Sequence, residues 1–305
     1  MAKLSKREIS LQKEILEMID RDEPLEQHER DFIYAHFDEA YYGHVSQSGA
    51  FFTPVEMAKE FHLDVPGGRG SRVVDLCAGI GMLSYIQYKN NYNYDRPKEI
   101  VCVELNPEFV RIGKKLLPEA TWICGDVLDK SLWEELGPFD AAYGNPPFSK
   151  IKSTSDTSWL SYTGPEFEFK VMEVAARVAD RSAFLIPQTS APFKCSGQSG
   201  FSDNPNAKYT KFLTDTGVML TNGIGIDFAF YQNDWKNTSM LVESVCIDLE
   251  DQLMGYDVQP KVITLRQELA TLSETREVET TPVEPLEVGT GREKDPEPVE
   301  QLSLF

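Results

Sequence analysis

The sequence predicts an α/β protein with a mostly parallel sheet and helices on both faces of that sheet. Between residues 72 and 186, short apolar runs alternate with helix-like segments, which is the pattern of parallel strands joined by crossover helices. Three successive runs end at an acid or at a glycine turn. The 305 residues are 41% apolar and 26% charged, which is ordinary globular usage and enough to bury a core.

Residues 1–48 are expected to form an N-terminal helical extension. Apolar residues recur at three- and four-residue spacing from Ile9 to Ile19, as on one face of a helix. A second helix is expected to begin near Pro24, because proline is favoured in a first turn, and to continue to about residue 45.

The central domain, residues 49–250, is expected to carry the sheet. Its strand candidates are short apolar runs, and one helix candidate begins with Pro107. We expect strands at 72–76, 100–103, 120–124, 139–143, 182–186, 226–231 and 242–249, and helices at 82–88, 107–117 and 167–179. Residues 188–213 have no strong period and are expected to form a long loop.

The last 35 residues differ from the rest in composition. Residues 271–305 hold nine acids, three bases and four prolines, a composition too polar and too charged to bury a core. We therefore expect residues 251–300 to be an acidic, mostly disordered linker, followed by a separate peptide at 301–305.

Charge and composition exclude several classes of protein. The net charge of −19 excludes a uniformly basic nucleic-acid-binding coat, although a local basic patch stays possible. No apolar run reaches the roughly 20 residues of a membrane-spanning helix, and the first ten residues do not begin a secretory signal. The five cysteines form no C-x-x-C pair, and the four histidines lack metal-ligand spacing, so we expect reduced thiols, no metal site and a cytoplasmic protein.

The segment Asp75-Leu-Cys-Ala-Gly-Ile-Gly81 follows the first strand directly. Its glycines let a ligand approach the backbone where helix N–H groups face it. It lacks the full G-x-G-x-x-G pattern, so an ordinary strand-to-helix turn is the alternative. Glu104 and Asp126 end the next two strands, where carboxylates can accept from ribose hydroxyls and from an adenine amino group. Because the three strand ends come in series, a nucleoside site is favoured over solvated acids.

The segment Asn145-Pro-Pro-Phe148 carries the sharpest chemical signal. Two consecutive prolines fix the backbone, so the Asn145 side-chain oxygen and the Pro146 carbonyl form a rigid pair of acceptors. Such a pair suits a planar amino group, whose lone pair becomes available once two accepted hydrogen bonds favour a tetrahedral nitrogen. Phe148 offers a face for a base to stack on. The alternative is an ordinary Asn-Pro turn after a strand.

Together with Ala50-Phe-Phe-Thr-Pro54 upstream, these motifs resemble the class I S-adenosylmethionine-dependent methyltransferases, specifically the N6-adenine DNA methyltransferases of the gamma arrangement. The resemblance covers about residues 45–250. It implies a Rossmann-like methyltransferase fold with a seven-stranded sheet, and S-adenosylmethionine as cofactor. It assigns cofactor binding to Phe52, Thr53, Pro54, Asp75, Ala78, Gly79, Gly81, Glu104 and Asp126, and catalysis to Asn145, Pro146, Pro147 and Phe148. Thr53 and Pro54 also fit a helix start, with threonine as cap, and both interpretations can hold.

The resemblance implies methyl transfer to N6 of a flipped adenine in DNA, in a bacterial or phage-infected cell. Gamma-type enzymes usually carry a separate target-recognition domain, and none is expected after residue 250. Loops at 149–166 and 188–213 would then read the target, with Lys150, Lys152 and Lys194 holding phosphates. We therefore expect a short or relaxed target sequence, with scattered surface lysines as the alternative.

Gln301-Leu-Ser-Leu-Phe305 resembles the short peptide by which bacterial replication and repair proteins bind the DNA sliding clamp. In that family a glutamine and two apolar residues fill the binding pockets, and Gln301, Leu304 and Phe305 match them. A flexible linker would raise the local concentration of the enzyme on DNA behind a clamp. The alternative is a tail whose last residues pack back onto the domain.

Two other functions stay open at this stage. Methyltransferases of RNA adenine or protein glutamine use a similar Asn-Pro-Pro-aromatic segment, because an amide nitrogen presents the same chemical problem. The chain could also be a catalytically retired clamp-binding or DNA-mimicking decoy, which its acidic charge fits. The intact Asn145–Phe148 segment argues against a decoy, since a decoy has no need of it.

Overall fold

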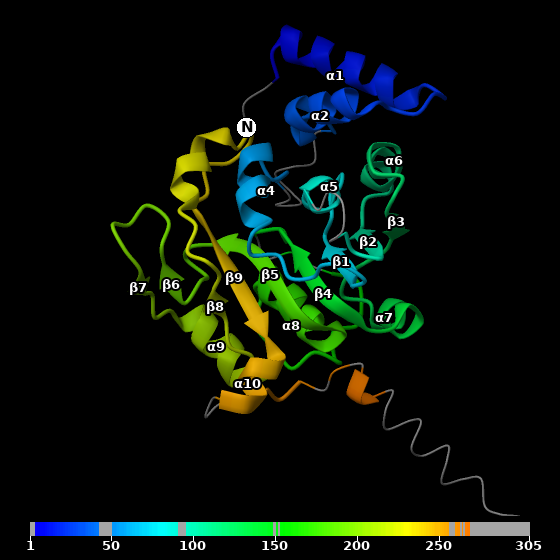
Figure 1. Ribbon diagram of the computed structural model, residues 1–305. Helices are drawn as coiled ribbons and strands as arrows, with labels where there is room; N and C mark the ends of the chain where they lie inside the picture. Colours follow the sequence, from blue (N-terminus) through cyan, green and yellow to red (C-terminus); the bar gives the residue numbers. More distant parts are fainter. Residues whose placement is uncertain are drawn as a thin grey trace, which may run out of the picture. The chain divides into compact units, whose positions relative to one another are not determined.

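The computed structural model describes residues 4–42, 51–90, 96–148, 151, 153–255, 260–262, 264 and 266–268. These residues lie in one compact unit that runs to Glu268. Their main sheet has seven strands in the order β3-β2-β1-β4-β5-β9-β8 (Figure 1). The strands are β1 (Arg72–Leu76), β2 (Glu99–Glu104), β3 (Thr121–Cys124), β4 (Phe139–Gly144), β5 (Ala179–Pro187), β8 (Thr221–Asn222) and β9 (Val242–Asp248).

The direction of the strands completes the fold assignment. β3, β2, β1, β4 and β5 pair in parallel, whereas β9 runs antiparallel to both β5 and β8. A parallel sheet with one reversed strand near its edge, covered by helices on both faces, is a Rossmann-like methyltransferase fold. The fold class that the sequence predicts is confirmed.

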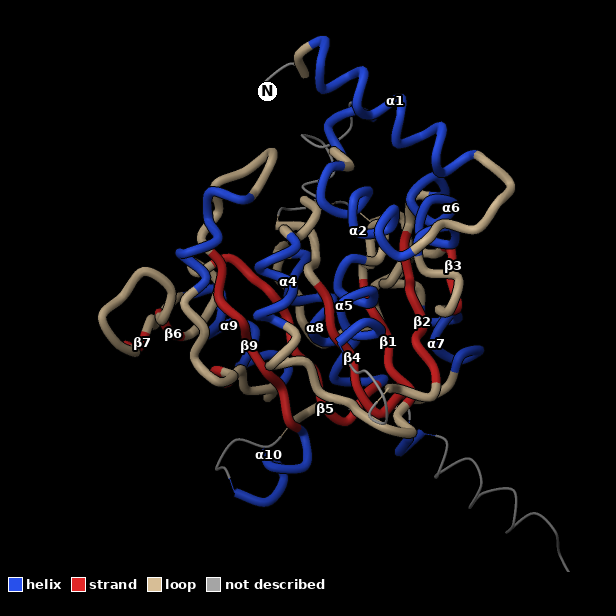
Figure 2. Tube along the Cα trace, turned by 45° about the horizontal axis from the view of Figure 1, so that its top comes forward, coloured by secondary structure: helices blue, strands red, loops and turns tan. Residues whose placement is uncertain are grey.

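Helices cover both faces of the sheet (Figures 1 and 2). One apolar cluster joins the N-terminal helices, α4, α5 and α6 to the sheet, and a second cluster joins α7, α8 and α9 to the opposite face. The helices are α1 (Lys6–Asp20), α2 (Gln27–His36), α4 (Val55–Phe61), α5 (Met82–Asn90), α6 (Pro107–Leu116), α7 (Lys130–Leu136), α8 (Phe167–Val178), α9 (Ala207–Thr216) and α10 (Leu249–Gly255), with the 3₁₀ helices η1 (Glu39–Tyr42) and η2 (Phe228–Asp234).

Local sequence explains most of these elements. β1 is buried on both faces, with Val73 in one apolar cluster and Val74 in the other, which is typical of a central parallel strand. α6 begins as its sequence predicts: the Asn106 side chain accepts from the Glu108 N–H, and Pro107 occupies the first turn. The predicted strands at 72–76, 100–103, 120–124, 139–143, 182–186 and 242–249 are all present within a few residues of the expected bounds.

Three element predictions from local pattern are wrong. The second N-terminal helix, expected to continue to about residue 45, ends at His36 and is followed by η1. The expected loop at 188–213 contains α9 and a two-stranded hairpin, β6 (Phe193–Lys194) with β7 (Ser202–Asp203). Asn206 caps α9, and Phe212 is stacked on Phe169 of α8 with ring centroids 5.0 Å apart, so tertiary packing supplies what a weak period did not show. The expected strand at 226–231 is the 3₁₀ helix η2, because the Asp227 side chain accepts from the Ala229 N–H and starts a helical turn.

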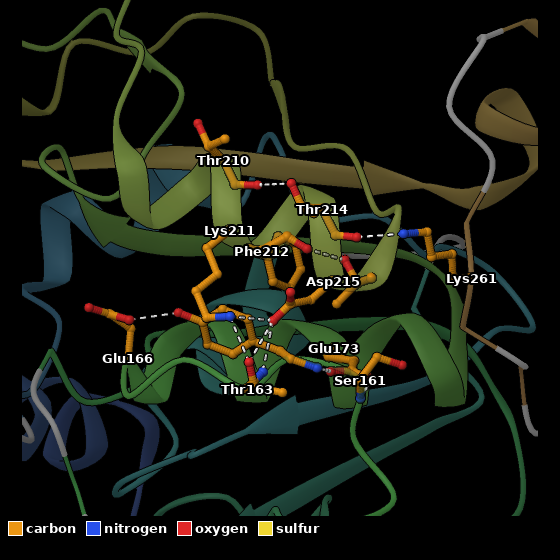
Figure 3. A network of polar contacts seen from close by, with 12 residues as sticks. Ser161, Thr163, Glu166, Glu173, Thr210, Lys211, Phe212, Thr214, Asp215 and Lys261 are labelled. Carbon is orange, nitrogen blue, oxygen red and sulfur yellow. Dashed lines mark hydrogen bonds and ion pairs between the residues drawn. The ribbon is translucent and has the colours of Figure 1, made fainter.

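A network of polar contacts, the α8–α9 network, fixes the segment before α8 (Figure 3). Glu173 of α8 is fully buried, accepts from the N–H groups of Ser161 and Tyr162, and pairs with Arg177. From α9, Asp215 accepts from the Thr163 N–H at 3.0 Å and pairs with Lys211. The segment is therefore held from two helices at once.

The packed part of the chain continues past residue 250. The Lys261 N–H donates to the Thr216 carbonyl at 2.7 Å, Val262 is buried, and Arg266 pairs with Asp140 and Asp180. In the part of the chain that the structure describes, no helix is long and apolar enough to cross a membrane. All five cysteines are free thiols.

Candidate active site

A cavity of about 450 Å³, the edge cavity, lies where the carboxyl ends of β1, β2, β3 and β4 meet. This is the edge of a parallel sheet at which ligands bind, and the volume suits a small-molecule site. Nine of the residues predicted from sequence line it: Phe52, Thr53, Asp75, Ala78, Gly79, Glu104, Asp126, Asn145 and Pro147. Pro54, Gly81, Pro146 and Phe148 stand beside these residues in the chain but are not part of the lining.

The turn after β1 is joined to the end of β2. The Ala78 N–H donates to the Val103 carbonyl, and the Gly79 N–H donates to Glu104 Oε2, both at 2.9 Å. Gly79 has φ +59°, and a Cβ there would lie 2.9 Å from the Phe52 ring. A glycine is therefore required both by the backbone and by the close approach of that ring.

Gly81, which the sequence also assigns to cofactor binding, does not line the edge cavity. It has φ +90°, and a Cβ there would lie 2.8 Å from the Trp122 ring. Because Gly81 has no side chain, the start of α5 can pack closely against Trp122 of β3.

The Glu104 carboxylate stands at the end of β2, as predicted. Its Oε2 accepts from Gly79, and its Oε1 accepts from the Asn106 N–H at 2.8 Å. Burial raises the pKa of Glu104, and hydrogen bonds from the backbone of Asn106, Gly79 and Leu105 oppose that rise. Each oxygen keeps a second lone pair for a hydroxyl donor.

Asp75 and Asp126 both line the edge cavity but differ in their hydrogen bonding. Asp75 is 1% exposed, and its Oδ2 accepts from the Ser84 hydroxyl at 2.8 Å, while its Oδ1 is buried without a partner. Burial raises the pKa of Asp75 to about 7. Asp126 accepts from the Leu128 N–H and from the hydroxyls of Ser153 and Ser155. Asp126 therefore ties the segment after Phe148 to the end of β3.

Asn145 is held in one orientation by the segment before α4. Its Nδ2 donates to the Phe51 carbonyl at 3.0 Å and to Thr53 Oγ1 at 2.9 Å. A carbonyl can only accept, so the amide nitrogen must face it. The Asn145 Oδ1 therefore points the other way, where it is buried and has no partner among the described residues.

Thr53 has a different role from a helix cap. α4 begins after Pro54, and no side chain caps it, so the interpretation of Thr53 as cap and Pro54 as first helical residue is wrong. The buried Thr53 hydroxyl orients the Asn145 amide instead.

Phe148 belongs to a cluster of aromatic rings. Phe148 lies 6.5 Å from Phe51 and 6.3 Å from Trp235 between ring centroids, edge-on to the second. Trp235 is 6% exposed, and its indole nitrogen has no partner among the described residues. It follows η2 and carries no local motif, so only the folded chain reveals its position.

Of the three lysines predicted to hold phosphates, the structure describes Lys194 alone. Lys150 and Lys152 lie outside the described residues. Lys194 is in β6, half-buried, and does not line the edge cavity. Gln301, Leu304 and Phe305 also lie outside the described residues.

Sequence reasoning missed two residues of the N-terminal extension. Glu39 and Tyr42, both in η1, line the edge cavity. The Tyr42 hydroxyl donates to Glu108 at 2.9 Å, and its ring packs edge-on against Phe109. The one available signal was the aromatic pair Tyr41-Tyr42 shortly before Phe51.

No protein-family model matches the chain. No curated protein matches it either. Solved structures do resemble it. One is the methyltransferase subunit of a type I restriction-modification system from Streptococcus thermophilus, 17% identical with a TM-score of 0.45, over 80% of this chain and 58% of that one. The chain thus spans little more than half the length of that subunit.

Two other similar solved structures are methyltransferases named for other substrates. An rRNA methylase from Streptococcus thermophilus is 13% identical with a TM-score of 0.37, over 64% of this chain and 96% of that one. The magnesium protoporphyrin IX methyltransferase of Synechocystis PCC 6803, solved with bound S-adenosylmethionine, is 12% identical with a TM-score of 0.36, over 81% and 100%. These likenesses concern the fold alone, and strand order and direction are what establish the fold of this chain.

Proposed function

We propose that this chain transfers a methyl group from S-adenosylmethionine to N6 of adenine in DNA. The observation that carries the proposal is the Asn145 amide, whose nitrogen is engaged by Phe51 and Thr53 and whose oxygen is buried and unpaired at the edge cavity. A buried acceptor without a donor is costly. A substrate amino group would supply the missing donor.

The residues of the edge cavity fit the proposed cofactor. Glu104 and Asp126 stand at successive strand ends, where ribose hydroxyls and an adenine amino group would find acceptors. The unpaired Oδ1 of Asp75 supplies a further acceptor, and Phe52 covers the glycine turn. When bound, S-adenosylmethionine supplies a methyl group on a positively charged sulfur.

The chain's own contribution to the reaction is positioning. The Asn145 oxygen and the Pro146 carbonyl would accept from the two hydrogens of the amino group, which aims its lone pair at the methyl donor. Phe148 and its aromatic neighbours would hold the flipped base by its faces. No strong base is required, because the nitrogen becomes acidic as it gains positive charge.

DNA is preferred over RNA or protein glutamine because Phe52-Thr53-Pro54 resembles the segment of the DNA enzymes and because Thr53 contacts Asn145 directly. A short or relaxed target follows from the proposal that loops alone read it. Labelled S-adenosylmethionine offered with DNA, RNA and protein separates the three substrates, and label in N6-methyladenine of DNA alone is the expected result.

The Asn145→Ala variant tests the proposed catalytic role. Transfer should fall by roughly 10²–10³-fold or more, as when one preorganised partner of a transition state is removed. Cofactor affinity by calorimetry should stay near that of the wild type. Equal loss of binding and transfer would contradict the role, and a wild-type chain that binds no cofactor would support the decoy alternative instead.

We also propose that the DNA sliding clamp recruits the enzyme through Gln301, Leu304 and Phe305. The support is the sequence match alone. Replacing the three residues by alanine should slow methylation of circular DNA loaded with the bacterial clamp and leave methylation of short oligonucleotides unchanged. Equal rates on clamp-loaded DNA would contradict the recruitment.

A further inference from the structure

The N-terminal extension places a buried carboxylate in the edge cavity. Glu39 is 3% exposed and lines the cavity. Its Oε2 is buried and has no hydrogen-bond partner among the described residues. Burial raises the pKa of Glu39, and a hydrogen bond from the Asn237 side chain and the charge of Lys236 offset only part of that cost. A donor from a ligand in the cavity would remove that cost.

Distant parts of the chain hold Glu39 in place. The Gln12 side chain donates to the His36 carbonyl at 2.9 Å and accepts from the Asp38 N–H at 3.0 Å. Gln12 is itself 2% exposed, so these bonds are shielded from water. The residues just before η1 are thus held in place from α1.

A second set of contacts comes from the segment after η2. Lys236 Nζ donates to the Phe37 carbonyl at 2.6 Å, and the Asn237 amide donates to Asp38 at 2.9 Å. These residues follow Trp235, which packs on Phe148. Residues 235–237 therefore contact Phe148 on one side and the segment just before Glu39 on the other.

We propose that Glu39 is a cofactor-binding residue whose carboxylate accepts a hydrogen bond from the α-ammonium group of the cofactor's methionine part. This inference rests on the proposed function. Glu104 and Asp126 are the proposed acceptors for the ribose hydroxyls and the adenine amino group. The sulfonium has charge but no N–H or O–H, so the ammonium is the strong donor that remains.

The chemistry of the two groups agrees. An ammonium carries three donors, so it can serve both Glu39 Oε2 and the unpaired Oδ1 of Asp75. Charge-assisted hydrogen bonds are roughly twice as strong as neutral ones. Glu39 would then make the N-terminal extension part of the cofactor site and would discriminate ligands by their amino-acid end.

Calorimetry with two ligands that differ at that end tests the inference on the full chain. S-adenosylhomocysteine has the α-ammonium group, and 5′-methylthioadenosine keeps the nucleoside and lacks the amino acid. Glu39→Gln should weaken binding of the first on the order of 10- to 100-fold, the range for a lost charge-assisted hydrogen bond. Its affinity for the second should stay within about twofold of wild type.

Controls separate a ligand contact from a loss of structure. Glu134→Gln, on the exposed surface of α7 and outside the edge cavity, should leave both affinities unchanged. Thermal unfolding should show that Glu39→Gln still folds cooperatively, because the glutamine amide keeps the size of the side chain and can still accept a hydrogen bond. Glu39→Asp retracts the carboxylate by one methylene and should also weaken S-adenosylhomocysteine selectively.

Three results would overturn the inference. Equal weakening of both ligands, or no weakening of either, would show that Glu39 does not meet the amino-acid end, while the proposed cofactor would survive. Loss of folding in both Glu39 variants would make its role structural. A wild-type chain that binds neither ligand would instead contradict the proposed function, and the inference with it.

Discussion

Hydrogen bonds fix the orientation of the Asn145 side-chain amide. The amide has two ends of opposite hydrogen-bonding character, and the Phe51 carbonyl accepts only from the nitrogen end. Thr53 adds a second partner on the same side. The oxygen end is then left buried without a partner among the described residues, because the reversed amide would lose both hydrogen bonds.

The Thr53 hydroxyl can be tested separately from the asparagine. Thr53→Val keeps the shape and removes one partner of the amide nitrogen, so transfer should fall about tenfold, the value of one typical hydrogen bond. Thr53→Ser keeps the hydroxyl and should retain most activity. Single-turnover methylation measures both, and equal rates for the valine and serine variants would contradict an orienting role.

Asp75 makes stability depend on pH in a defined direction. Its pKa is about 7 in the folded chain because of burial, against about 4 for an exposed aspartate. Below pH 4 both states are protonated and there is no penalty. As pH rises from 4 to 7 the unfolded state releases its proton and the folded state keeps it, so the folded state is progressively destabilised, and the full penalty remains above pH 7.

Asp75→Asn should therefore gain stability relative to the wild type as pH rises from 5 to 8. Urea unfolding at several pH values measures the difference in free energy of unfolding between the two proteins. A constant difference across that range would show that Asp75 does not titrate as described.

The turn between β1 and α5 is the element on which the cofactor site depends most directly. Gly79 combines a positive φ with the close approach of Phe52, whereas a Cβ added to Gly200 would meet no atom within 4 Å. Gly79→Ala should cost about 1–2 kcal/mol of stability from the backbone alone and weaken cofactor binding. Gly200→Ala is the matched control and should change neither the thermal unfolding midpoint nor the calorimetric affinity for the cofactor. Similar behaviour of the two variants would contradict a specific requirement for glycine at position 79.

α8 holds the segment that precedes it, around Ser161 and Tyr162. Glu173→Ala would remove the carboxylate partner of the half-buried Arg177 and the acceptor of the Ser161 and Tyr162 N–H groups. We expect a loss of about 3–5 kcal/mol in the free energy of unfolding. The exposed Glu134→Ala should cost less than about 1 kcal/mol. Chemical denaturation measures both, and a small loss for Glu173→Ala would mean that the segment is held by other contacts.

At the scale of the whole molecule, the N-terminal extension is part of the same unit as the sheet. Ile15, Ile33 and Phe37 are almost fully buried in the cluster that also contains β1 and α5. The Tyr34 hydroxyl donates to the Ile80 carbonyl in the turn before α5, and its ring stacks on Tyr85 at 4.5 Å.

Truncation at the two ends should have opposite effects. Deleting residues 1–42 exposes this apolar surface and should yield an aggregated or unfolded chain. Deleting residues 269–305, which follow the compact unit, should shift the unfolding midpoint by no more than about 2 °C. Circular dichroism during heating measures both, and a stable product of the first deletion would contradict the shared core.

The sequence by itself determined the central sheet and the positions of its ligand-binding ends. Apolar runs closed by Asp75, Glu104, Asp126 and Asn145 are local patterns, and parallel strands must bring their carboxyl ends to one edge. The same local pattern failed for α9 and η2, because caps at Asn206 and Asp227 and packing of Phe212 outweighed the apparent period.

Only the tertiary structure decided which other side chains reach that edge and how each is oriented. Lys236 contacts Phe37 across 199 residues of sequence, and Glu39 and Trp235 come to the site from segments with no motif of their own. The neighbouring residues in the sequence mark Thr53 as a site residue. What its hydroxyl does is seen only from its hydrogen bond with Asn145, 92 residues away. Local sequence sets backbone geometry, whereas a binding site is made by contacts between distant segments that only the packed core brings together.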